Sequence, residues 1–353
     1  MEKKNFHVVL KSRPGEDNEP SESNFSFEEV PFPPEPPKDG EVLIRNEYLS
    51  LDPALRCAMN RDTGVSYLKA WEIGETLSGF GGVGTIVSSG DPNYIPGDLV
   101  TAFYHWPWKV YFIISSSSVR KIPVEISAIS PTICLNLTGL TGLTAYLGVR
   151  EKAHVIKGAN QTMVVSGAAG ATGSVAGQVA KAEGCDKVVG ICGSDTKCQI
   201  LTEELGFHAA INYKTESVTA RLQQICPEGV DIYFDNVGGS ISDEVIRLMN
   251  PDSHVVLCGQ ISLYNKNVPY PPPLSEEISA ILKERNITRE RFLVLNYADK
   301  FDSSVEELLK LIVAGKIKAK ETVEMGLANV GRAFVSMMTG GNIGKQLVKV
   351  TEQ

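Results

Sequence analysis

The sequence predicts an α/β protein in which a doubly wound parallel sheet is joined to a β-rich unit. Between residues 160 and 300, short runs rich in valine and isoleucine alternate with stretches of helical period. These runs carry little polar alternation, which is typical of parallel strands covered on both faces. Residues 1–125 instead contain short apolar runs broken by glycine, proline and aspartate, a spacing that indicates antiparallel strands.

Each expected element follows from these two rhythms. In the β-rich unit we expect strands over 6–10, 41–51, 81–90, 98–104 and 110–122. In the parallel sheet we expect strands over 162–167, 187–193, 209–214, 230–239, 253–259 and 291–297, with helices over 173–184 and 195–206. After residue 300, helices over 304–315 and 330–338, a segment over 317–326 and a strand over 344–350 have no sheet of their own. We expect them to return to the first unit, so the predicted domains are 1–125 with 300–353, and 126–299.

Composition limits the class of partner. The 353 residues fit about two domains, and a formal net charge of −8 provides no concentrated basic field for nucleic acid, so a small molecule is the expected partner. Residues 1–15 contain no long apolar run, which predicts neither a secretory signal nor a membrane span and makes the cytoplasm the expected location. The seven cysteines form no Cys-x-x-Cys pair, and the five histidines never stand three to five residues apart. We therefore expect reduced thiols and no metal site.

A glycine pattern follows the first expected strand of the parallel sheet. Gly167, Gly170 and Gly173 form a G-x-x-G-x-x-G variant between that strand and an expected helix, which is the context of a dinucleotide-binding turn. Glycine permits the tight turn and a close backbone approach to a pyrophosphate, whose charge the helix N-terminus favours. The alternative is a turn of small residues kept only for packing. Because alternating strands and helices follow, the sequence favours a Rossmann-type dinucleotide site.

The end of the next expected strand indicates which dinucleotide binds. NAD sites place an acidic residue there for the ribose 2′-hydroxyl, but this chain has Gly193 and Ser194 at the corresponding positions. Lys197 lies one turn further along and is suited to pair with a 2′-phosphate, which favours NADP(H). The alternative for Lys197 is an ordinary solvated helix lysine.

Longer segments carry a family resemblance over essentially the whole chain. SGAAGATGSVAGQ, LGFHAAINYK, DIYFDNVGG, CGQISLYN and GGNIGKQLV resemble the zinc-independent branch of the medium-chain dehydrogenase/reductase superfamily. That branch includes leukotriene B4 12-hydroxydehydrogenase and the prostaglandin reductases. VLKSRPG, LSLDPALRCAMN, DTGVSYLKAW, VPYPPPLS, NITRERFLVLNY and MMTGGNIGKQ resemble the reductases of 15-oxoprostaglandin 13-reductase type. The resemblance implies a GroES-like catalytic domain beside an NADP-binding Rossmann domain.

The same resemblance implies a reaction without metal. Zinc-using relatives carry Gly-His-Glu near residues 77–84 and a four-cysteine loop after it, and this chain has neither. The implied activity is NADPH-dependent reduction of the 13,14 double bond of 15-keto-prostaglandins to 13,14-dihydro-15-keto-prostaglandins. Alternatives are a reductase of short alkenals or quinones, a non-catalytic NADPH-binding protein and a metal-dependent alcohol dehydrogenase. We expect a monomer or a homodimer, with the monomer preferred.

The resemblance also implies roles for individual residues. Tyr264 is the expected catalytic donor to the enolate oxygen; the alternative is a buried tyrosine whose hydroxyl satisfies a carbonyl group. The residues expected to bind the cofactor are Gly170, Ala171, Thr172, Gly173, Lys197, Tyr213, Asn236, Cys258, Gly259, Gln260, Ile261, Ser262, Leu263, Tyr264 and Asn342. The residues expected to bind the substrate are Tyr67, Phe103, Tyr104, Phe292, Leu293 and Val294.

Several of these assignments leave an ordinary structural alternative open. Tyr213 is equally suited to be a strand aromatic, Asn236 a turn asparagine, and the substrate-site aromatics part of the core. The proline-rich loop 269–273 follows Tyr264 closely and is expected either to act as a lid or to be a static turn.

Overall fold

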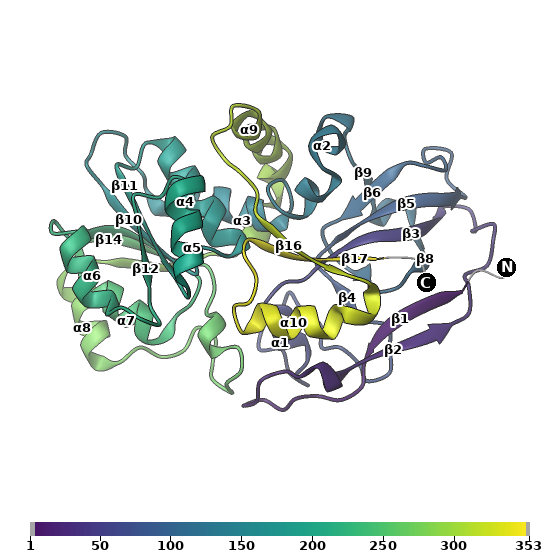
Figure 1. The fold of residues 1–353 in the computed structure, drawn as a ribbon, viewed down its shortest axis with the longest axis horizontal. Helices are drawn as coiled ribbons and strands as arrows, with labels where there is room; N and C mark the ends of the chain where they lie inside the picture. The colour runs from purple at the N-terminus through teal and green to yellow at the C-terminus, as the bar shows by residue number, and fades with distance from the viewer. Residues whose placement is uncertain (1–3, 351–353) are drawn as a thin grey trace. The chain divides into compact units, whose positions relative to one another are not determined.

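The computed structural model describes residues 4–350, which form two compact units (Figure 1). Unit 1 comprises the described residues up to Gly139, the three residues Asn265–Asn267, and the described residues from Glu321 onward. Unit 2 comprises Leu140–Tyr264 and Val268–Lys320. In the described part of the chain, no helix is both long enough and apolar enough to span a bilayer.

Unit 2 contains the predicted parallel sheet. Its strands are β10 (Thr162–Ser166), β11 (Lys187–Cys192), β12 (Ala209–Asn212), β13 (Val230–Asp235), β14 (Met249–Leu257) and β15 (Thr288–Arg291). They run in the order β12-β11-β10-β13-β14-β15, and every neighbouring pair is parallel. This is the doubly wound order, in which the chain reverses its direction of travel across the sheet between β10 and β13. The predicted α/β class with a Rossmann sheet is confirmed.

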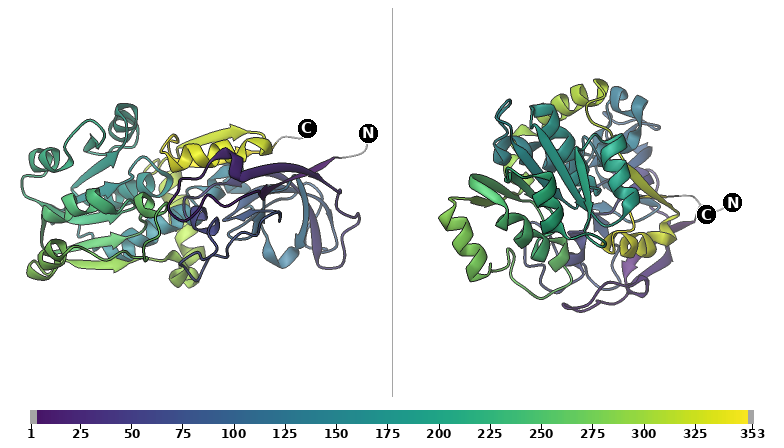
Figure 2. Two further views of the ribbon diagram at one scale, coloured as in Figure 1. Left: turned by 90° about the horizontal axis from the view of Figure 1, so that it is seen from below. Right: turned by 60° about the vertical axis from the view of Figure 1, so that its left-hand side comes forward.

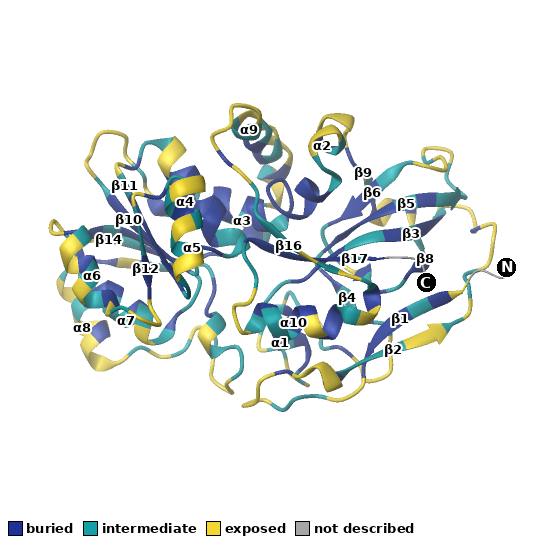
Figure 3. Ribbon diagram, viewed as in Figure 1, coloured by how far each residue is buried: buried dark blue, intermediate teal, exposed yellow. Residues whose placement is uncertain are grey.

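Helices cover both faces of this sheet, as the strand composition predicts. One layer consists of α6 (Val218–Ile225), α7 (Gly239–Arg247) and α8 (Glu276–Glu284), which share an apolar cluster with alternate strand residues (Figure 1). The other includes α3 (Leu140–Gly148), α4 (Ala171–Glu183) and α9 (Phe301–Val313), with α5 (Asp195–Gln199) next to β11 and β12. Every residue of β10 is buried, because side chains on both faces of the strand meet a helix layer (Figure 3).

Unit 1 is built on an antiparallel-rich sheet of seven strands. They are β3 (Glu41–Ser50), β5 (Gly82–Ser89), β6 (Leu99–Ala102), β8 (Tyr111–Ser115), β9 (Arg120–Lys121), β16 (Glu321–Met325) and β17 (Lys345–Lys349). Two smaller sheets pair β1 (Asn5–Leu10) with β2 (Phe25–Val30), and β4 (Ser78–Gly79) with β7 (Trp106–Pro107). The unit also holds α1 (Leu55–Ala58), α2 (Val124–Ile129) and α10 (Val330–Met338). This is the β-rich GroES-like architecture that the resemblance implies.

The core of unit 1 is aromatic. Trp106 and Trp108 are fully buried, and Trp71 lies edge-on to Trp108 with ring centroids 5.1 Å apart. Gly82 makes room for this core, since an added Cβ would lie 2.1 Å from the Trp106 indole nitrogen. The core therefore relies on bulky rings packed against bare backbone.

Two expectations differ from the structure. The strand expected over 291–297 is wrong, because β15 ends at Arg291 and a 3-10 helix occupies Val294–Lys300. Phe292 and Val294 are nevertheless buried, so their apolar run reflects packing beneath α3 rather than strand pairing. In the tail, β16 and β17 join the sheet of unit 1 as expected, whereas α9 packs against α3 within unit 2.

Compact units are not the same as independently folding domains. The units change at Gly139 and Lys320, later than the predicted boundaries at 125 and 300. The domain ranges 1–125 with 300–353, and 126–299, stay a prediction. Figure 2 shows in two further views how the parallel sheet of unit 2 is layered with its helices.

Candidate functional site

The glycine turn lies between β10 and α4, and its backbone geometry explains its composition. Gly167 has φ of +58°, a left-handed conformation that side chains disfavour. The Gly170 N–H donates to Gly167 O at 2.9 Å, closing the turn just before α4 begins at Ala171. A Cβ on Gly173 would lie 2.5 Å from Gly167 O, so glycine is required there by close backbone contact. The first N–H groups of α4 point beyond the helix end, which suits a pyrophosphate.

A buried carboxylate connects the strand ends at the point where the strand order reverses, between β10 and β13. Asp235 ends β13 and has no exposed surface. Its Oδ1 accepts hydrogen bonds from Ser166 Oγ at 3.1 Å and Tyr233 Oη at 2.9 Å. The same oxygen accepts from the N–H groups of Val237 at 3.0 Å and Gly238 at 2.8 Å. One carboxylate oxygen thus ties the end of β10 to the loop after β13, which fixes the floor of the site.

Asn236 locks the same two strand ends together. Its backbone N–H donates to Ser166 Oγ at 3.0 Å, and its side-chain Nδ2 donates to Ser166 O at 2.8 Å. These bonds place the asparagine beside the glycine turn, and a Cβ added to Gly167 would lie 3.5 Å from the Asn236 Cβ, at ordinary contact distance. The structure gives Asn236 a defined role in the turn, and its expected contact with the nicotinamide stays a prediction.

The segment from Cys258 to Tyr264 crosses the carboxyl end of β13. The N–H groups of Cys258 and Gly259 both donate to Asp235 O, at 2.9 and 3.0 Å. Ser262 Oγ donates to Val237 O at 2.6 Å, and a 3-10 turn over Ile261–Leu263 leads to Tyr264. The same segment contains Gln260, which is buried.

The Tyr264 hydroxyl lies over this segment. A Cβ added to Gly259 would be 3.3 Å from Tyr264 Oη and 3.3 Å from Asn236 O. The phenol is therefore folded back over its own loop, and Gly259 leaves the space for it. Tyr264 is half-buried rather than enclosed in the core. Its hydroxyl lies at the carboxyl edge of the sheet, where ligands bind in open α/β folds.

The cofactor-selecting turn lies at the end of β11. Ser194 Oγ accepts the Lys197 N–H at 3.3 Å and so caps α5. Asp195 in the first turn of α5 is engaged elsewhere, because its Oδ1 accepts from Asn212 Nδ2 at 2.7 Å. This arrangement leaves no acidic side chain at the Gly193–Ser194 positions where a 2′-hydroxyl would need one.

Tyr213 and Lys214 lie against Gly193, and Lys197 follows four residues later in the chain. A Cβ on Gly193 would lie 3.1 Å from Tyr213 Cε1 and 3.3 Å from Lys214 Cε. Burial lowers the pKa of Lys197, and the positive charge of Lys214 lowers it further. Two like charges beside a half-exposed tyrosine favour an anion between them, and a 2′-phosphate has the required charge. Sequence reasoning missed Lys214, although it directly follows Tyr213 in the segment that carried the resemblance.

The thiols near this region are neutral at physiological pH. The seven cysteines are free, and Cys192 Sγ lies 3.4 Å from Cys198 Sγ. Burial raises the pKa of the Cys192 thiol to about 12, and burial likewise raises the pKa of the Cys258 thiol to about 12. Nucleophilic catalysis needs the thiolate, so these groups are better suited to packing than to covalent chemistry.

The expected substrate residues divide between the two units. In unit 1, the Phe103 and Tyr104 rings have centroids 6.3 Å apart, and Arg120 Cζ lies 3.8 Å above the Phe103 ring. Burial raises the pKa of Tyr104 to about 12, so its phenol stays protonated. Tyr67 is half-buried in the same unit, and Asn342 Nδ2 donates to Gly344 O at 2.7 Å just before β17.

The unit 2 members of the substrate set lie partly in the core. Phe292 is buried, stacks on Tyr297 with ring centroids 5.4 Å apart, and lies near Gly148 of α3. Val294 is also buried, whereas Leu293 is half-buried. Their substrate role stays a prediction, as does that of the unit 1 aromatics.

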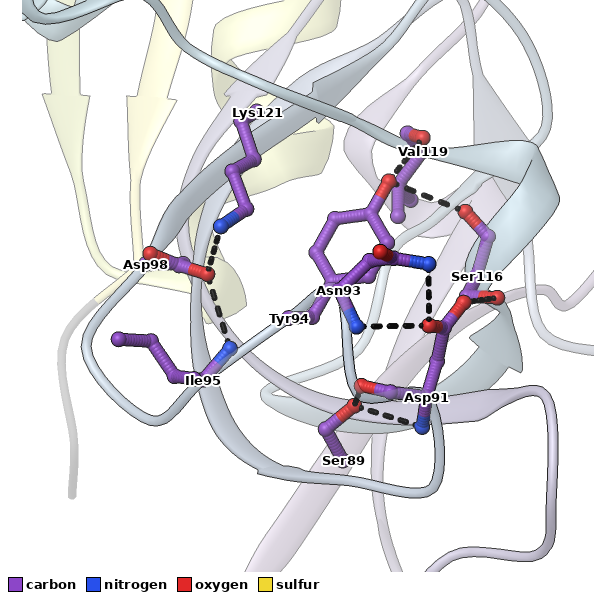
Figure 4. Close-up of polar contacts among 9 residues, drawn as sticks. All are labelled: Ser89, Asp91, Asn93, Tyr94, Ile95, Asp98, Ser116, Val119 and Lys121. Carbon is purple, nitrogen blue, oxygen red and sulfur yellow. Dashed lines mark hydrogen bonds and ion pairs between the residues drawn. The ribbon is translucent and has the colours of Figure 1, made fainter.

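The residues present do not fit a zinc site. The strand and turn over 78–84 read Ser-Gly-Phe-Gly-Gly-Val-Gly and offer no imidazole or carboxylate. The loop that follows is held by Asp91, which accepts from Ser116 Oγ at 2.6 Å, and by Asp98, which pairs with Lys121 at 2.7 Å (Figure 4). Among residues 4–350, no three His, Cys, Asp or Glu side chains gather closely enough to hold a metal ion.

Two family models match this architecture. Residues 7–122 match the N-terminal domain of oxidoreductase, and residues 171–313 match zinc-binding dehydrogenase. The second description names zinc, whereas the described residues contain no group of three or more His, Cys, Asp or Glu side chains that could hold a metal ion.

Curated relatives match over nearly the whole chain. The putative NADP-dependent oxidoreductase YfmJ of Bacillus subtilis is 40% identical over 94% of this chain and 94% of its own length. Prostaglandin reductase 1 of Bos taurus is 37% identical over 94% of this chain and 95% of its own length. NADPH-dependent curcumin reductase of Escherichia coli is 32% identical over 99% and 98%.

A solved structure carries the cofactor. CurA from Vibrio vulnificus in complex with NADPH superposes with a TM-score of 0.87 at 32% identity, covering 99% of this chain and 100% of CurA. The glycine turn, the lysine pair and the missing acidic residue of the present chain all fit the same dinucleotide. The cofactor is therefore NADPH.

Proposed function

The chain belongs to the zinc-independent, NADP-dependent branch of the medium-chain dehydrogenase/reductase superfamily, and we propose that it reduces the 13,14 double bond of 15-keto-prostaglandins. The product is the 13,14-dihydro-15-keto-prostaglandin. The coarser activity, an NADP-dependent reductase of the enone or alkenal type, follows from the family. The prostaglandin substrate is the more specific part of the proposal. It rests on the resemblance to 15-oxoprostaglandin 13-reductases and on the bovine relative.

The position of Tyr264 carries the proposal. When bound, NADPH supplies a hydride for the β-carbon of the enone, and the ketone oxygen then gains negative charge as an enolate. The Tyr264 hydroxyl, held over Gly259 at the carboxyl edge of the sheet, donates a hydrogen bond to that oxygen. A donor placed where charge develops contributes roughly 3–4 kcal/mol to catalysis in comparable sites.

The remaining residues orient the cofactor and select the cofactor and the substrate. The glycine turn over 167–173 accepts the pyrophosphate, while Lys197, Tyr213 and Lys214 hold the 2′-phosphate. Asn236 and the segment Cys258–Tyr264 face the nicotinamide, and Asn342 completes the cofactor set. Tyr67, Phe103, Tyr104 and the segment Phe292–Val294 contact the lipid chain. The α-carbon of the enolate takes its proton from solvent.

A second candidate keeps the chemistry and changes the substrate. The relative named for curcumin shows that a chain 32% identical over nearly full length is associated with a different enone. A short alkenal or a non-prostanoid enone is therefore the alternative. The catalytic hydroxyl is the same in both, so only substrate preference separates them.

The experiment is a substrate panel with product identification. Oxidation of NADPH, and of NADH in parallel, is followed with 15-keto-prostaglandin E2, a short alkenal, curcumin and a quinone. The proposal expects the largest kcat/KM for the prostaglandin, with a product two hydrogens heavier that is saturated at carbons 13 and 14. A larger kcat/KM for curcumin or the alkenal would transfer the assignment to the second candidate. Binding of NADPH without turnover of any substrate would leave the non-catalytic binding protein as the function.

The proposal includes a cytoplasmic location, a monomer in preference to a homodimer, and a lipid substrate that binds beside NADPH. Sedimentation of the purified protein with NADPH tests the oligomeric state. A stable dimer would replace the monomer without affecting the chemistry.

A further inference from the structure

A three-residue segment directly after Tyr264 is held by a buried arginine. The chain leaves unit 2 at Tyr264, and Asn265–Asn267 belong to unit 1 before the chain returns to unit 2 at Val268. Within unit 1, Arg56 Nε donates to Asn265 Oδ1 at 2.9 Å. The side chain and the backbone of Asn267 are also bonded, to Glu16 Oε2 at 2.7 Å and Asp17 Oδ1 at 2.9 Å. This short segment is thus fixed at both ends.

Arg56 is a costly residue to bury, and its surroundings are built for it. The side chain comes from α1 and has no exposed surface. Besides Asn265, its guanidinium donates to Asn60 Oδ1 and to the carbonyl oxygens of Gly15 and Asn18, each at 2.8 Å. All four acceptors are neutral, so the hydrogen bonds satisfy the donors without a counter-charge. Burying a cation costs desolvation free energy, and removing one partner of a buried charge leaves polar groups unpaired. The geometry of the Arg56 hydrogen bonds is what we take to offset this cost.

The planar guanidinium joins three separate segments. Its donors point in fixed directions, so α1, the turn at residues 15–18 and Asn265 are held in one mutual arrangement. The turn at residues 15–18 also supplies Asp17, whose carboxylate accepts from the Asn267 backbone. Arg56 therefore supports the segment Asn265–Asn267 both directly and through the turn beneath it.

We propose that Arg56 and Asn265 are positioning residues, which fix the backbone immediately after Tyr264 and thereby hold the Tyr264 hydroxyl in its catalytic place. Asn265 is covalently joined to Tyr264, so its anchoring limits the conformations of the tyrosine backbone. On the side of unit 2, the Tyr264 N–H donates to Ile261 O at 3.3 Å, and Asn265 adds an anchor on the other side of the tyrosine. The proposal rests on the proposed function, because the effect is read through the role of Tyr264.

The first experiment compares two asparagines that accept from the same arginine. Asn265→Ala removes the anchor, while Asn60→Ala removes an equivalent acceptor that does not adjoin Tyr264. Asn265→Asp keeps an oxygen for the guanidinium and serves as the rescue. We expect Asn265→Ala to lower kcat at least roughly tenfold, since displacing a catalytic group by about 1 Å can cost about a hundredfold. Asn60→Ala and Asn265→Asp should stay within about twofold of the wild type in kcat, and all three variants within about twofold in NADPH Kd.

The outcomes separate positioning from general stability. Equal loss of kcat in Asn265→Ala and Asn60→Ala would overturn the proposal, because Arg56 would then act only through the fold. An unchanged kcat in Asn265→Ala would overturn it as well. Arg56→Lys keeps the charge and loses the fork, but it can fail to fold, so the asparagine variants carry the test.

A second readout does not depend on turnover. Amide hydrogen exchange is measured on peptides covering residues 258–268 in the three variants. Faster exchange in Asn265→Ala than in Asn60→Ala supports the anchor, and equal exchange contradicts it. If the wild type reduces no enone, the proposed function fails while this readout still decides the anchor. If Tyr264→Phe lowers kcat and Asn265→Ala does not, the anchor fails while the function stands.

Discussion

The glycine turn of unit 2 and the aromatic cluster of unit 1 serve one expected reaction but are specified in different ways. In the turn, Gly167 and Gly173 are fixed by a positive φ and by a 2.5 Å approach of an added Cβ to a carbonyl oxygen. In the cluster, Phe103 and Tyr104 lie 6.3 Å apart among other large rings, with Arg120 above one of them. The glycine turn depends on a backbone conformation that leaves no room for a side chain. The aromatic cluster depends on large side chains, which many different backbone conformations can carry.

This difference explains why the cofactor-binding turn can be recognised in the sequence and the substrate-binding aromatic residues cannot. A backbone cradle leaves a pattern of small residues at fixed spacing, and few other structures need that pattern. An aromatic wall leaves residues that a core uses equally well, as Phe292 shows by stacking on Tyr297 beneath α3. Three tests by substitution and one by pH titration, in decreasing order of expected effect, follow from this contrast.

The largest effect is expected in the turn. Gly173→Ala places a methyl group 2.5 Å from Gly167 O, and overpacking of this kind costs about 1–3 kcal/mol of unfolding free energy. It also displaces the backbone that accepts the pyrophosphate, so the NADPH Kd should rise more than about tenfold. Chemical denaturation and fluorescence titration measure the two effects. Gly170→Ala is the stability control, since its Cβ would have one contact at 3.2 Å and its φ is −80°; equal destabilisation in both would contradict the geometric account.

The next effect concerns cofactor selection. Lys214→Ala should raise the NADPH Kd about tenfold or more and leave the NADH Kd unchanged, because hydrogen bonds to charged groups contribute about 1.5–3 kcal/mol. Lys197→Ala should behave alike. Lys181→Ala, whose Nζ donates to Gly206 O at 2.8 Å, is the matched control on the same unit. Equal weakening of NADPH and NADH binding would show that the lysines support the fold rather than the 2′-phosphate.

In the aromatic cluster, the expected effect is smaller and falls on kcat/KM for the enone rather than on the NADPH Kd. Phe103→Leu should lower kcat/KM for the enone about three- to tenfold and leave the NADPH Kd unchanged, since aromatic contacts contribute about 0.5–1.5 kcal/mol beyond their area. Phe6→Leu, which disrupts a stacked pair with Phe27 elsewhere in unit 1, controls for stability. If both variants lose only stability, the cluster is core and the substrate wall lies elsewhere.

The smallest effect concerns the thiols. Since burial raises the pKa of Cys258 to about 12, its thiolate fraction should rise about tenfold per pH unit from pH 7 to 11, without a plateau. Alkylation by iodoacetamide, followed by peptide mass at Cys258, should rise in the same way. An exposed cysteine with a pKa near about 8.5 would level off above pH 9. A plateau there would show that Cys258 is more accessible to water than the structure indicates.

Much of the fold was predictable because parallel strands with two covered faces have few polar positions. All strands of the unit 2 sheet were expected, and only the last was misplaced, since Phe292 and Val294 form a buried apolar run without sheet pairing. Burial alone produces such a run, and periodicity cannot separate the two causes over a few residues.

The parts of the site that could be predicted are those whose residues lie close together in the sequence. The turn at 167–173 and the lysine at 197 follow from local patterns, whereas Tyr264 needed the family resemblance. Lys214 was missed because its importance comes from lying against Gly193, which follows the neighbouring strand β11. Arg56 was missed for the same reason, since its acceptors lie at residues 15, 18, 60 and 265, and no local pattern links them.

The most direct measurement is the hydride-transfer step itself, in single turnover with C4-deuterated NADPH. Wild type and Tyr264→Phe are mixed with 15-keto-prostaglandin E2, the absorbance of NADPH is followed, and the product is examined for the position of deuterium. The account predicts deuterium at carbon 13 in both proteins, with the step at least about tenfold slower in the variant and the NADPH Kd unchanged. Deuterium at the carbonyl carbon, or an equal rate in Tyr264→Phe, would contradict it.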